Sequence, residues 1–254
     1  MDRIEENNWR QIEDLNQRGM QMLSVIDLIL AGTVDINVAA FVCEKMSRGS
    51  SILTAAKPGG AGKTTVMAAF LGFIPPGTSI ITVSNPSILN PNNPCHVAPE
   101  YLLVHEIGSG YYYGYIWGED VKRYFSLIKP GRSIASNLHC DTIEELIAVL
   151  NGQLAVPLEL IQKVDLLLFI SISGSFMKMK RRVSRVYEST SVNHRLVFSH
   201  NPKNDNFECK ENNIFSDKVK QMRAFLEQLV RQREFEYRAV RRRFLEFYPN
   251  LIKP

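Results

Sequence analysis

The feature that most constrains this chain is a glycine-rich stretch at residues 57–65, with the sequence KPGGAGKTT. It follows a short apolar run at residues 51–56 and precedes a run at residues 66–71 that suits a helix. A phosphate-binding loop requires this order of strand, turn and helix, because glycines let backbone N–H groups converge on phosphate oxygens at a helix N-terminus. The sequence therefore predicts such a loop, and the alternative is a glycine-rich turn that binds no ligand.

The positions of this loop have expected roles. Lys63 is placed to reach the β- and γ-phosphates of a nucleotide, and the Thr64 hydroxyl is placed to ligate Mg²⁺. The residues expected to contact the nucleotide are Gly59, Gly60, Ala61, Gly62, Lys63, Thr64 and Thr65. One position departs from the usual pattern, because Lys57 stands where the first glycine of the motif is normally found.

The composition predicts a cytoplasmic globular protein. The chain has 254 residues, of which 45% are hydrophobic and 22% charged, enough for one α/β domain with additions. The four cysteines form no CxxC pair, which argues against a zinc site or a disulfide framework and favours a reducing compartment. The most apolar window, residues 23–43, is interrupted by Asp27, Asp35 and Asn37 and is therefore not expected to span a membrane.

Strands that alternate with helices predict an α/β fold with a mostly parallel sheet covered on both faces. Beyond the strand at 52–56, strands are expected at residues 79–83, 101–104, 133–138 and 164–172. Short antiparallel edge strands are expected at residues 177–180, 182–188 and 195–199, followed by a polar loop at 201–213 and helical periodicity at 219–248. We therefore predict an N-terminal helical segment (1–50), a core (51–200) and a C-terminal helical segment (201–254).

Two of the expected strands end in residues that suit phosphate chemistry. Glu106 follows the strand at 101–104, and His139 follows the strand at 133–138. Because ligands bind at the carboxyl edge of open α/β sheets, both residues are expected near the loop. Glu106 is a candidate to hold the Mg²⁺ shell or to orient an attacking water, and His139 is a candidate donor to a γ-phosphate. The alternatives are a carboxylate that only ends a buried strand and a structural histidine.

Three segments in order, GGAGKTT at 59–65, YLLVHE at 101–106 and PGRSIASNLHCDT at 130–142, resemble the motor ATPases of type II and type IV secretion and type IV pilus systems, including their archaeal relatives. The resemblance covers about residues 20–248 and includes an Arg-Arg-Val strand at 181–183. It implies a RecA-like P-loop NTPase core that binds ATP and Mg²⁺ and hydrolyses ATP as a hexameric ring. It also implies Walker B and histidine-box roles for Glu106 and His139. A membrane-platform or secretion-apparatus protein, at the inner face of the membrane, is the implied partner.

Departures from this family favour binding over fast hydrolysis. The family usually places acidic residues after the strand that corresponds to 79–83, where a glutamate helps to activate water, but this chain has VSNP at 83–86. Gly108 stands where an arginine is common, and about fifty residues precede the first strand where most members have a larger N-terminal domain. A nucleotide-binding module that hydrolyses ATP poorly and serves assembly or regulation is therefore the alternative.

Arginines raise a further alternative. Arg123 and Arg132 lie close in sequence to the segments around Glu106 and His139 and are candidates to complete a neighbouring subunit's site, although a surface role is more common. The last helical segment carries Arg231, Arg233, Arg238, Arg241, Arg242 and Arg243. Such a run usually forms a solvated face, and if functional it would bind a neighbouring subunit, acidic lipid or nucleic acid. A nucleic-acid-dependent P-loop ATPase is thus a less favoured candidate.

Overall fold

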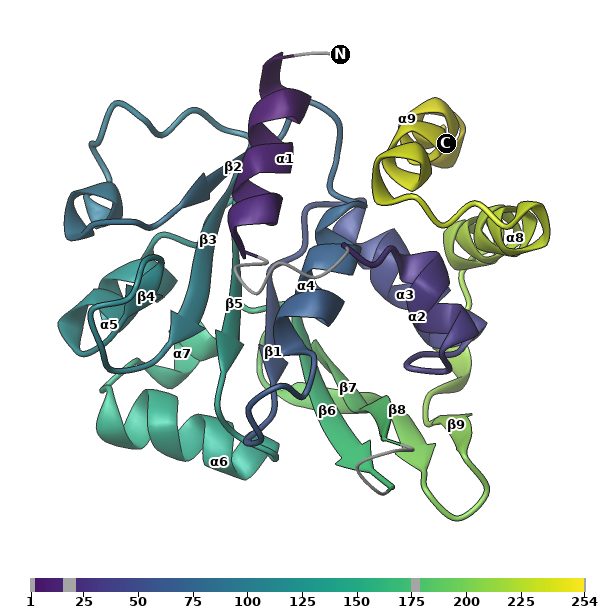
Figure 1. The fold of residues 1–254 in the computed structure, drawn as a ribbon. Helices are drawn as coiled ribbons and strands as arrows, with labels where there is room; N and C mark the ends of the chain where they lie inside the picture. The colour runs from purple at the N-terminus through teal and green to yellow at the C-terminus, as the bar shows by residue number, and fades with distance from the viewer. Residues whose placement is uncertain (1–2, 16–21, 175–178, 254) are drawn as a thin grey trace.

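The structure is a computed structural model that describes residues 3–15, 22–174 and 179–253 (Figure 1). Its helices are α1 (Arg3–Leu15), α2 (Val25–Leu30), α3 (Ile36–Met46), α4 (Lys63–Leu71), α5 (Glu119–Ser126), α6 (Ile143–Ile147), α7 (Leu158–Ile161), α8 (Asp217–Gln232) and α9 (Tyr237–Leu251). A π-helical segment (Ala148–Gln153) extends α6, and 3-10 turns occur at Pro86–Leu89 and Asn212–Ile214. None of the helices described here is long and apolar enough to cross a membrane.

One sheet organises the described chain. Its strands are β1 (Ile52–Ala55), β2 (Ser79–Thr82), β3 (Glu100–Ile107), β4 (Tyr115–Ile116), β5 (Arg132–Leu138), β6 (Leu166–Ser173), β7 (Lys180–Ser189), β8 (His194–Asn201) and β9 (Asn206–Cys209). They lie in the order β2-β3-β5-β1-β6-β7-β8-β9, with β4 beside the end of β3. The strands from β2 to β6 pair in parallel, whereas the pairs beyond β6 are antiparallel. This confirms the α/β fold expected, with a mostly parallel sheet and antiparallel edge strands.

The central strands are buried on both faces, which explains their continuous apolar sequences. All four residues of β1 are buried, and successive side chains point to opposite faces of the sheet. Ile52 packs in one hydrophobic core, together with Leu166 of the neighbouring strand β6. Leu53 packs in the other core, together with Leu167. A strand with this pattern is stable only between two layers of helices.

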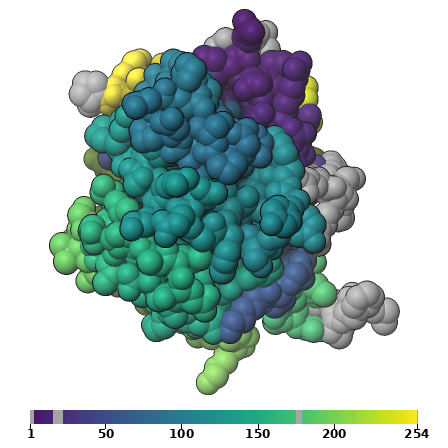
Figure 2. All heavy atoms as spheres, turned by 90° about the vertical axis from the view of Figure 1, so that its left-hand side faces the viewer, coloured from purple at the N-terminus to yellow at the C-terminus, as the bar shows by residue number. Residues whose placement is uncertain are grey.

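The helices supply these two layers (Figure 1). Helices α1 to α4, α8 and α9 lie on one side of the sheet, and α5, α6 and α7 lie on the other. Figure 2 views the second side, where the teal and green segments around α5 to α7 and the blue segment after β2 cover the sheet. The expected C-terminal helices are present as α8 and α9. The connection between them begins at Arg233, the C-cap of α8, which has a φ of 54°.

Some expected elements differ from the structure. The interpretation of residues 201–213 as a loop is wrong, because Asn206–Cys209 forms β9 and pairs with β8 through a turn at Asp205, whose φ is 54°. The four residues of β9 do alternate between polar and apolar, but with only two apolar positions in an otherwise polar segment the pattern is too short to stand out. One strand, β7, replaces the two expected between 177 and 188, and residues 177–178 lie outside the described part. The division at residues 50 and 200 stays a prediction.

Helix α1 closes one edge of the sheet with side-chain amides. The Asn8 amide donates to Thr78 O at 2.8 Å and accepts from Ile80 N at 2.7 Å. Gln11 accepts from Thr82 N at 2.9 Å. These contacts satisfy outward-facing backbone groups of β2 that a further strand would otherwise bind. The edge strand β2 is therefore covered although no strand lies beside it.

A buried ion pair joins the first and last helices. Arg241 of α9 donates to Glu5 of α1 through Nε at 3.0 Å and through a terminal nitrogen at 2.6 Å. It also donates to Gly72 O at 3.2 Å and to Ile74 O at 2.5 Å, and both charged side chains are buried. The expectation of a solvated arginine face is therefore wrong for Arg241. Burial here is tolerated because each donor of the guanidinium named above meets an oxygen.

Candidate functional site

The glycine-rich stretch forms the loop between β1 and α4. Gly60 and Gly62 have φ values of 76° and 94°, a left-handed conformation that residues with a Cβ rarely adopt. Gly62 is the N-cap of α4 and has no side chain with which to cap it. The partial positive charge of the helix N-terminus therefore faces the loop without a side-chain acceptor, which is the arrangement that favours an anion.

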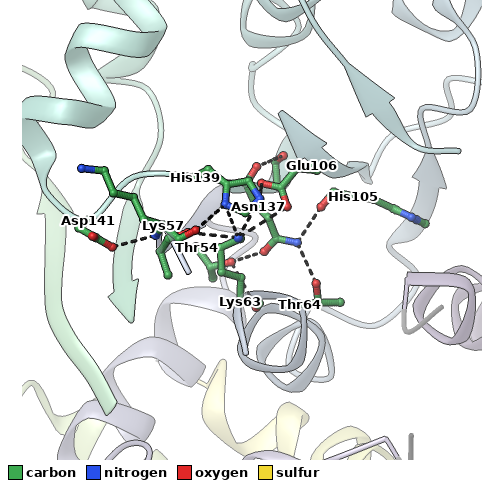
Figure 3. A network of polar contacts seen from close by, with 11 residues as sticks. Thr54, Lys57, Lys63, Thr64, His105, Glu106, Asn137, His139 and Asp141 are labelled. Carbon is green, nitrogen blue, oxygen red and sulfur yellow. Dashed lines mark hydrogen bonds and ion pairs between the residues drawn. The ribbon is translucent and has the colours of Figure 1, made fainter. Parts of the chain in front are cut away.

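The carboxyl ends of three parallel strands bring the expected site residues together (Figure 3). Nζ of Lys63, at the start of α4, lies 3.8 Å from Oε2 of Glu106, near the end of β3. The same Nζ lies 3.3 and 3.4 Å from the two ring nitrogens of His139, which follows β5. His139 Nε2 in turn lies 3.7 Å from Oε1 of Glu106. Of the other residues expected to contact a nucleotide, Gly59 and Ala61 lie in the loop, and Thr64 and Thr65 in the first turn of α4.

Glu106 is a buried carboxyl group beside the Lys63 ammonium and the His139 imidazole. Burial raises its pKa above the ordinary value, while the Lys63 ammonium and His139 act in the opposite direction. Among the described residues, no group donates a hydrogen bond to Oε1 of Glu106. A buried carboxylate oxygen without a donor is costly, and such groups concentrate at functional sites.

The two histidines that adjoin Glu106 in sequence or in space have different environments. His105 precedes Glu106 on β3, so its side chain points to the opposite face of the strand. The His105 ring packs edge-on against the Tyr113 ring, with 5.4 Å between the ring centroids. Burial lowers the pKa of His105 to about 4, which keeps it uncharged at neutral pH. His139, with about half of its side chain exposed, is the histidine that lies at the loop.

Asn137 lies at the centre of this site and is not among the residues expected there from the sequence. The Nδ2 group of Asn137 donates to Thr64 Oγ1 at 3.3 Å and to His105 O at 2.7 Å, and its Oδ1 accepts from Thr54 Oγ1. Asn137 is fully buried and so connects β1, β3, β5 and α4 from one position. The signal available in the sequence was an amide inside an apolar strand, which is unfavourable unless it is hydrogen-bonded.

The residues present fit a magnesium ion that arrives with a nucleotide. Among the described residues, no group of three or more His, Cys, Asp or Glu side chains could hold a metal ion alone. Mg²⁺ is commonly bound by one or two protein oxygens together with substrate phosphates and water. The Thr64 hydroxyl and Oε1 of Glu106, which accepts no hydrogen bond from the described residues, are oxygens of this kind, and Asn137 holds their two segments together.

Two other expected candidates lie elsewhere. Arg132 begins β5 and Glu100 begins β3, so both lie at the opposite end of the sheet from the loop. Arg132 donates to Glu100, and both side chains are almost completely buried. The hypothesis that Arg132 completes a neighbour's site is therefore wrong. Arg123 is exposed and bonds Asp120 at 3.2 Å on its own helix.

The described residues that directly follow β2, 83–86, carry no carboxylate. Residues 83–86 follow the strand, and Asn85 accepts from Ser87 N at 3.1 Å to begin the 3-10 turn. Gly108 lies beside Glu106, where a Cβ would be 3.4 Å from Cγ of that residue. Glu106 is therefore the acidic side chain that lies beside Lys63 and His139.

Lys57, which stands in the place of the first motif glycine, is directed away from the loop centre. Its ammonium bonds Glu145 of α6. Its backbone N–H donates to Asp141 Oδ1 at 2.8 Å, and its carbonyl oxygen lies 3.0 Å from His139 Nδ1 (Figure 3). The hydrogen bond to Glu145 raises the pKa of Lys57. Lys57 thus connects the loop to the segment that carries His139.

Because this lysine has a carboxylate partner, we expect Lys57→Gln to lower Mg-ATP affinity by at most about 5-fold, the range of an exposed ion pair. The backbone contacts to Asp141 and His139 remain in this variant. The measurement is nucleotide titration of the variant, of Glu145→Gln and of the double variant. The two single changes should not be additive, since both remove the same pair. A much larger loss in Lys57→Gln would mean that Lys57 contacts phosphate directly.

Comparisons with known proteins give distant similarities. No protein-family model matches the sequence. Over an alignment of 217 residues, the chain is 23% identical to the uncharacterized protein MJ1287 of Methanocaldococcus jannaschii. The alignment covers 72% of this chain and 77% of that protein. The X-ray structure of the ATPase DotB of Legionella pneumophila is similar with a TM-score of 0.42 and 8% identity, covering 81% of this chain. The chain spans 58% of the DotB chain, less than two thirds of its length.

Proposed function

We propose that this chain binds Mg-ATP at residues 57–65 and hydrolyses it to ADP and phosphate. The observation that supports this proposal most strongly is the convergence of Lys63, Glu106 and His139 at a glycine-rich loop and the N-terminus of α4. A cation, a buried carboxyl group and an imidazole in this arrangement suit phosphoryl transfer to water, which depends mainly on positioning and electrostatic stabilisation.

Each side chain has a distinct part in the proposed reaction. Lys63 and the loop N–H groups bind the phosphates, and His139 donates a hydrogen bond to the γ-phosphate. A water oxygen bonds to the γ-phosphorus as the bond from phosphorus to the β,γ-bridging oxygen breaks, and Glu106 accepts the proton of this water. Asn137 holds β5 against Thr64 and the end of β3, which keeps these groups in register. Bound magnesium, held by Thr64 and through water by Glu106, would neutralise phosphate charge.

We extend the proposal to the biological role by the resemblance to secretion and pilus motors. In this role the chain assembles as a homo-oligomeric ring on the cytoplasmic side of a membrane, where ATP hydrolysis moves a platform or secretion-apparatus protein. Residues 51–200 would form the ATPase core of each subunit. The support for this extension is the ordered set of motifs around Lys63, Glu106 and His139.

One observation favours a second candidate, a nucleotide-binding module with weak hydrolysis. The end of β2 lacks the carboxylate that the family uses to activate water, and residues 83–86 supply only uncharged side chains. A site that keeps Lys63 and loses one of two carboxylates would bind ATP well and turn it over slowly. No comparable observation favours nucleic acid, because Arg238 and Arg241 of the C-terminal run pair with Glu13 and Glu5 of α1.

The test is Mg-ATP binding by calorimetric titration and steady-state phosphate release on the full chain. Lys63→Ala removes the loop cation, and Lys122→Ala, an exposed lysine of α5, is the matched control. We expect binding and turnover in the wild type and the control and neither in Lys63→Ala. Binding without turnover would establish the second candidate in place of the first. Absence of binding in the wild type would overturn both.

A further inference from the structure

A second cationic side chain reaches the phosphate loop from a strand far away in sequence. Arg181 lies on β7, paired with Ile172 of β6, and β6 separates β7 from the loop strand β1. Its Nε donates to Gly60 O at 3.1 Å. A Cβ placed on Gly62 would lie 3.3 Å from Cδ of Arg181. The side chain therefore lies directly against the two glycines that shape the loop.

The charge of Arg181 differs from that of its neighbours on β7. Lys180 and Arg182 both form ion pairs with the Asp205 carboxylate, whose oxygens lie 2.7 Å from Lys180 Nζ and 2.9 Å from Arg182 Nε. Arg181, by contrast, makes no ion pair with a carboxylate among the described residues, and it is exposed. Its described acceptor is a backbone carbonyl, which leaves its positive charge uncompensated. An uncompensated guanidinium beside a helix N-terminus raises the affinity of that position for an anion.

We propose that Arg181 is a phosphate-binding residue of this site, supplied by the same chain that carries the loop. Its planar guanidinium can donate two parallel hydrogen bonds to phosphate oxygens, which the ammonium of Lys63 cannot do. This inference rests on the proposed ATP binding and adds to it a residue more than a hundred positions from the loop. It also replaces Arg132, which is buried with Glu100, as the arginine of the site.

The ligand class follows from the geometry. Arg181 contacts the loop at the backbone carbonyl of Gly60, whereas Lys63 lies next to Glu106 and His139. The two cations therefore approach a bound polyphosphate from different elements, β7 and α4. Arg181 is expected to add affinity for nucleoside di- and triphosphates and for pyrophosphate, and none for adenosine, which has no phosphate.

The experiment compares Arg181→Ala, Arg181→Gln and Arg181→Lys with Arg185→Ala, an exposed arginine of the same strand. Loss of a charge-assisted hydrogen bond should weaken Mg-ATP, Mg-ADP and pyrophosphate binding about 10- to 100-fold in the alanine and glutamine variants. Arg181→Lys should recover part of this loss, and Arg185→Ala should bind within about 2-fold of the wild type. Thermal unfolding of each variant shows whether the fold is retained.

Two outcomes would overturn the inference. One is unchanged affinity in both Arg181→Ala and Arg181→Gln, and the other is an equal loss for Arg185→Ala, which would indicate a general effect of charge. Neither outcome touches the proposed function, which depends on binding in the wild type and its loss in Lys63→Ala. Conversely, a wild type that binds no nucleotide would remove the proposed function first.

Discussion

Glu106→Gln is expected to lower ATP turnover by about 10²- to 10⁴-fold, the usual contribution of a positioned general base. The substitution keeps the size of the side chain and removes its capacity to accept a proton. Mg-ATP binding should remain measurable, because Lys63 and the loop are unchanged and Lys63 no longer faces a negative carboxylate at 3.8 Å. Phosphate release and nucleotide titration on the same preparation separate these two effects.

The matched control is Glu119→Gln, an exposed carboxylate in the first turn of α5. It should leave turnover within about 2-fold of the wild type, as is usual for surface substitutions. If Glu119→Gln abolished turnover and Glu106→Gln did not, the assignment of the base would be wrong. Such a result would also show that a carboxylate outside the loop replaces the acidic residues missing after β2.

The pH dependence of turnover should report the environment of Glu106. Glu106 must be ionised to accept a proton, and burial raises its pKa. Turnover should therefore fall on the acid side through a pKa higher than that of an ordinary glutamate, and be retained as the pH rises above it. The profile of kcat/KM gives the pKa in the free enzyme. An acid limb at or below the ordinary glutamate range would contradict Glu106 as the base.

Arg241→Ala should destabilise the fold by about 3–5 kcal/mol, the cost of removing one partner from a buried ion pair. The substitution leaves the Glu5 carboxylate buried without its partner and removes the donor to Gly72 O and Ile74 O. These two carbonyls follow α4, the helix that begins at the phosphate loop. Urea unfolding measures the change in the free energy of unfolding.

Arg242→Ala is the control for this prediction, because Arg242 is the next residue of α9 and is exposed. It should change the free energy of unfolding by no more than about 0.5 kcal/mol. Similar losses in the two variants would mean that helix propensity or overall charge, and not the pair with Glu5, stabilises α9. In Glu5→Ala the unpaired charge is Arg241, so this variant should be destabilised to a similar degree.

The glycine-rich loop and the central strands could be predicted because their signals are local. Three glycines followed by a lysine and two threonines specify a turn before a helix, and strands buried on both faces are continuously apolar in sequence. The placement of Glu106 and His139 beside the loop also followed, since parallel strands end at the same edge. Their roles, and those of the loop residues, stay predictions until nucleotide binding is measured.

The missed residues share one property, which is that their partners are far away in sequence. Asn137 contacts Thr54 and Thr64, and Arg181 contacts Gly60, 121 positions away. Arg241 and Glu5 are separated by 236 positions. For Arg181, Arg241 and Glu5 nothing in the local sequence distinguishes the side chain from a solvated one. For Asn137 the apolar strand around it indicates burial but not its partners, because these hydrogen bonds exist only once the sheet and its helices have packed. Arg132 was misplaced because it is close in sequence to His139, although it begins β5 and His139 follows the end of that strand.

The amides of Asn8 and Gln11 have a consequence for how copies of this chain can associate. An open strand edge invites another chain to add its own strand, which leads to filaments and insoluble material. At β2 the backbone groups that would bind such a strand are already bonded to α1, and a newcomer would have to displace the whole helix. If copies of this chain assemble into the proposed ring, we expect them to meet on this side through helices and loops, with each sheet kept within its own subunit.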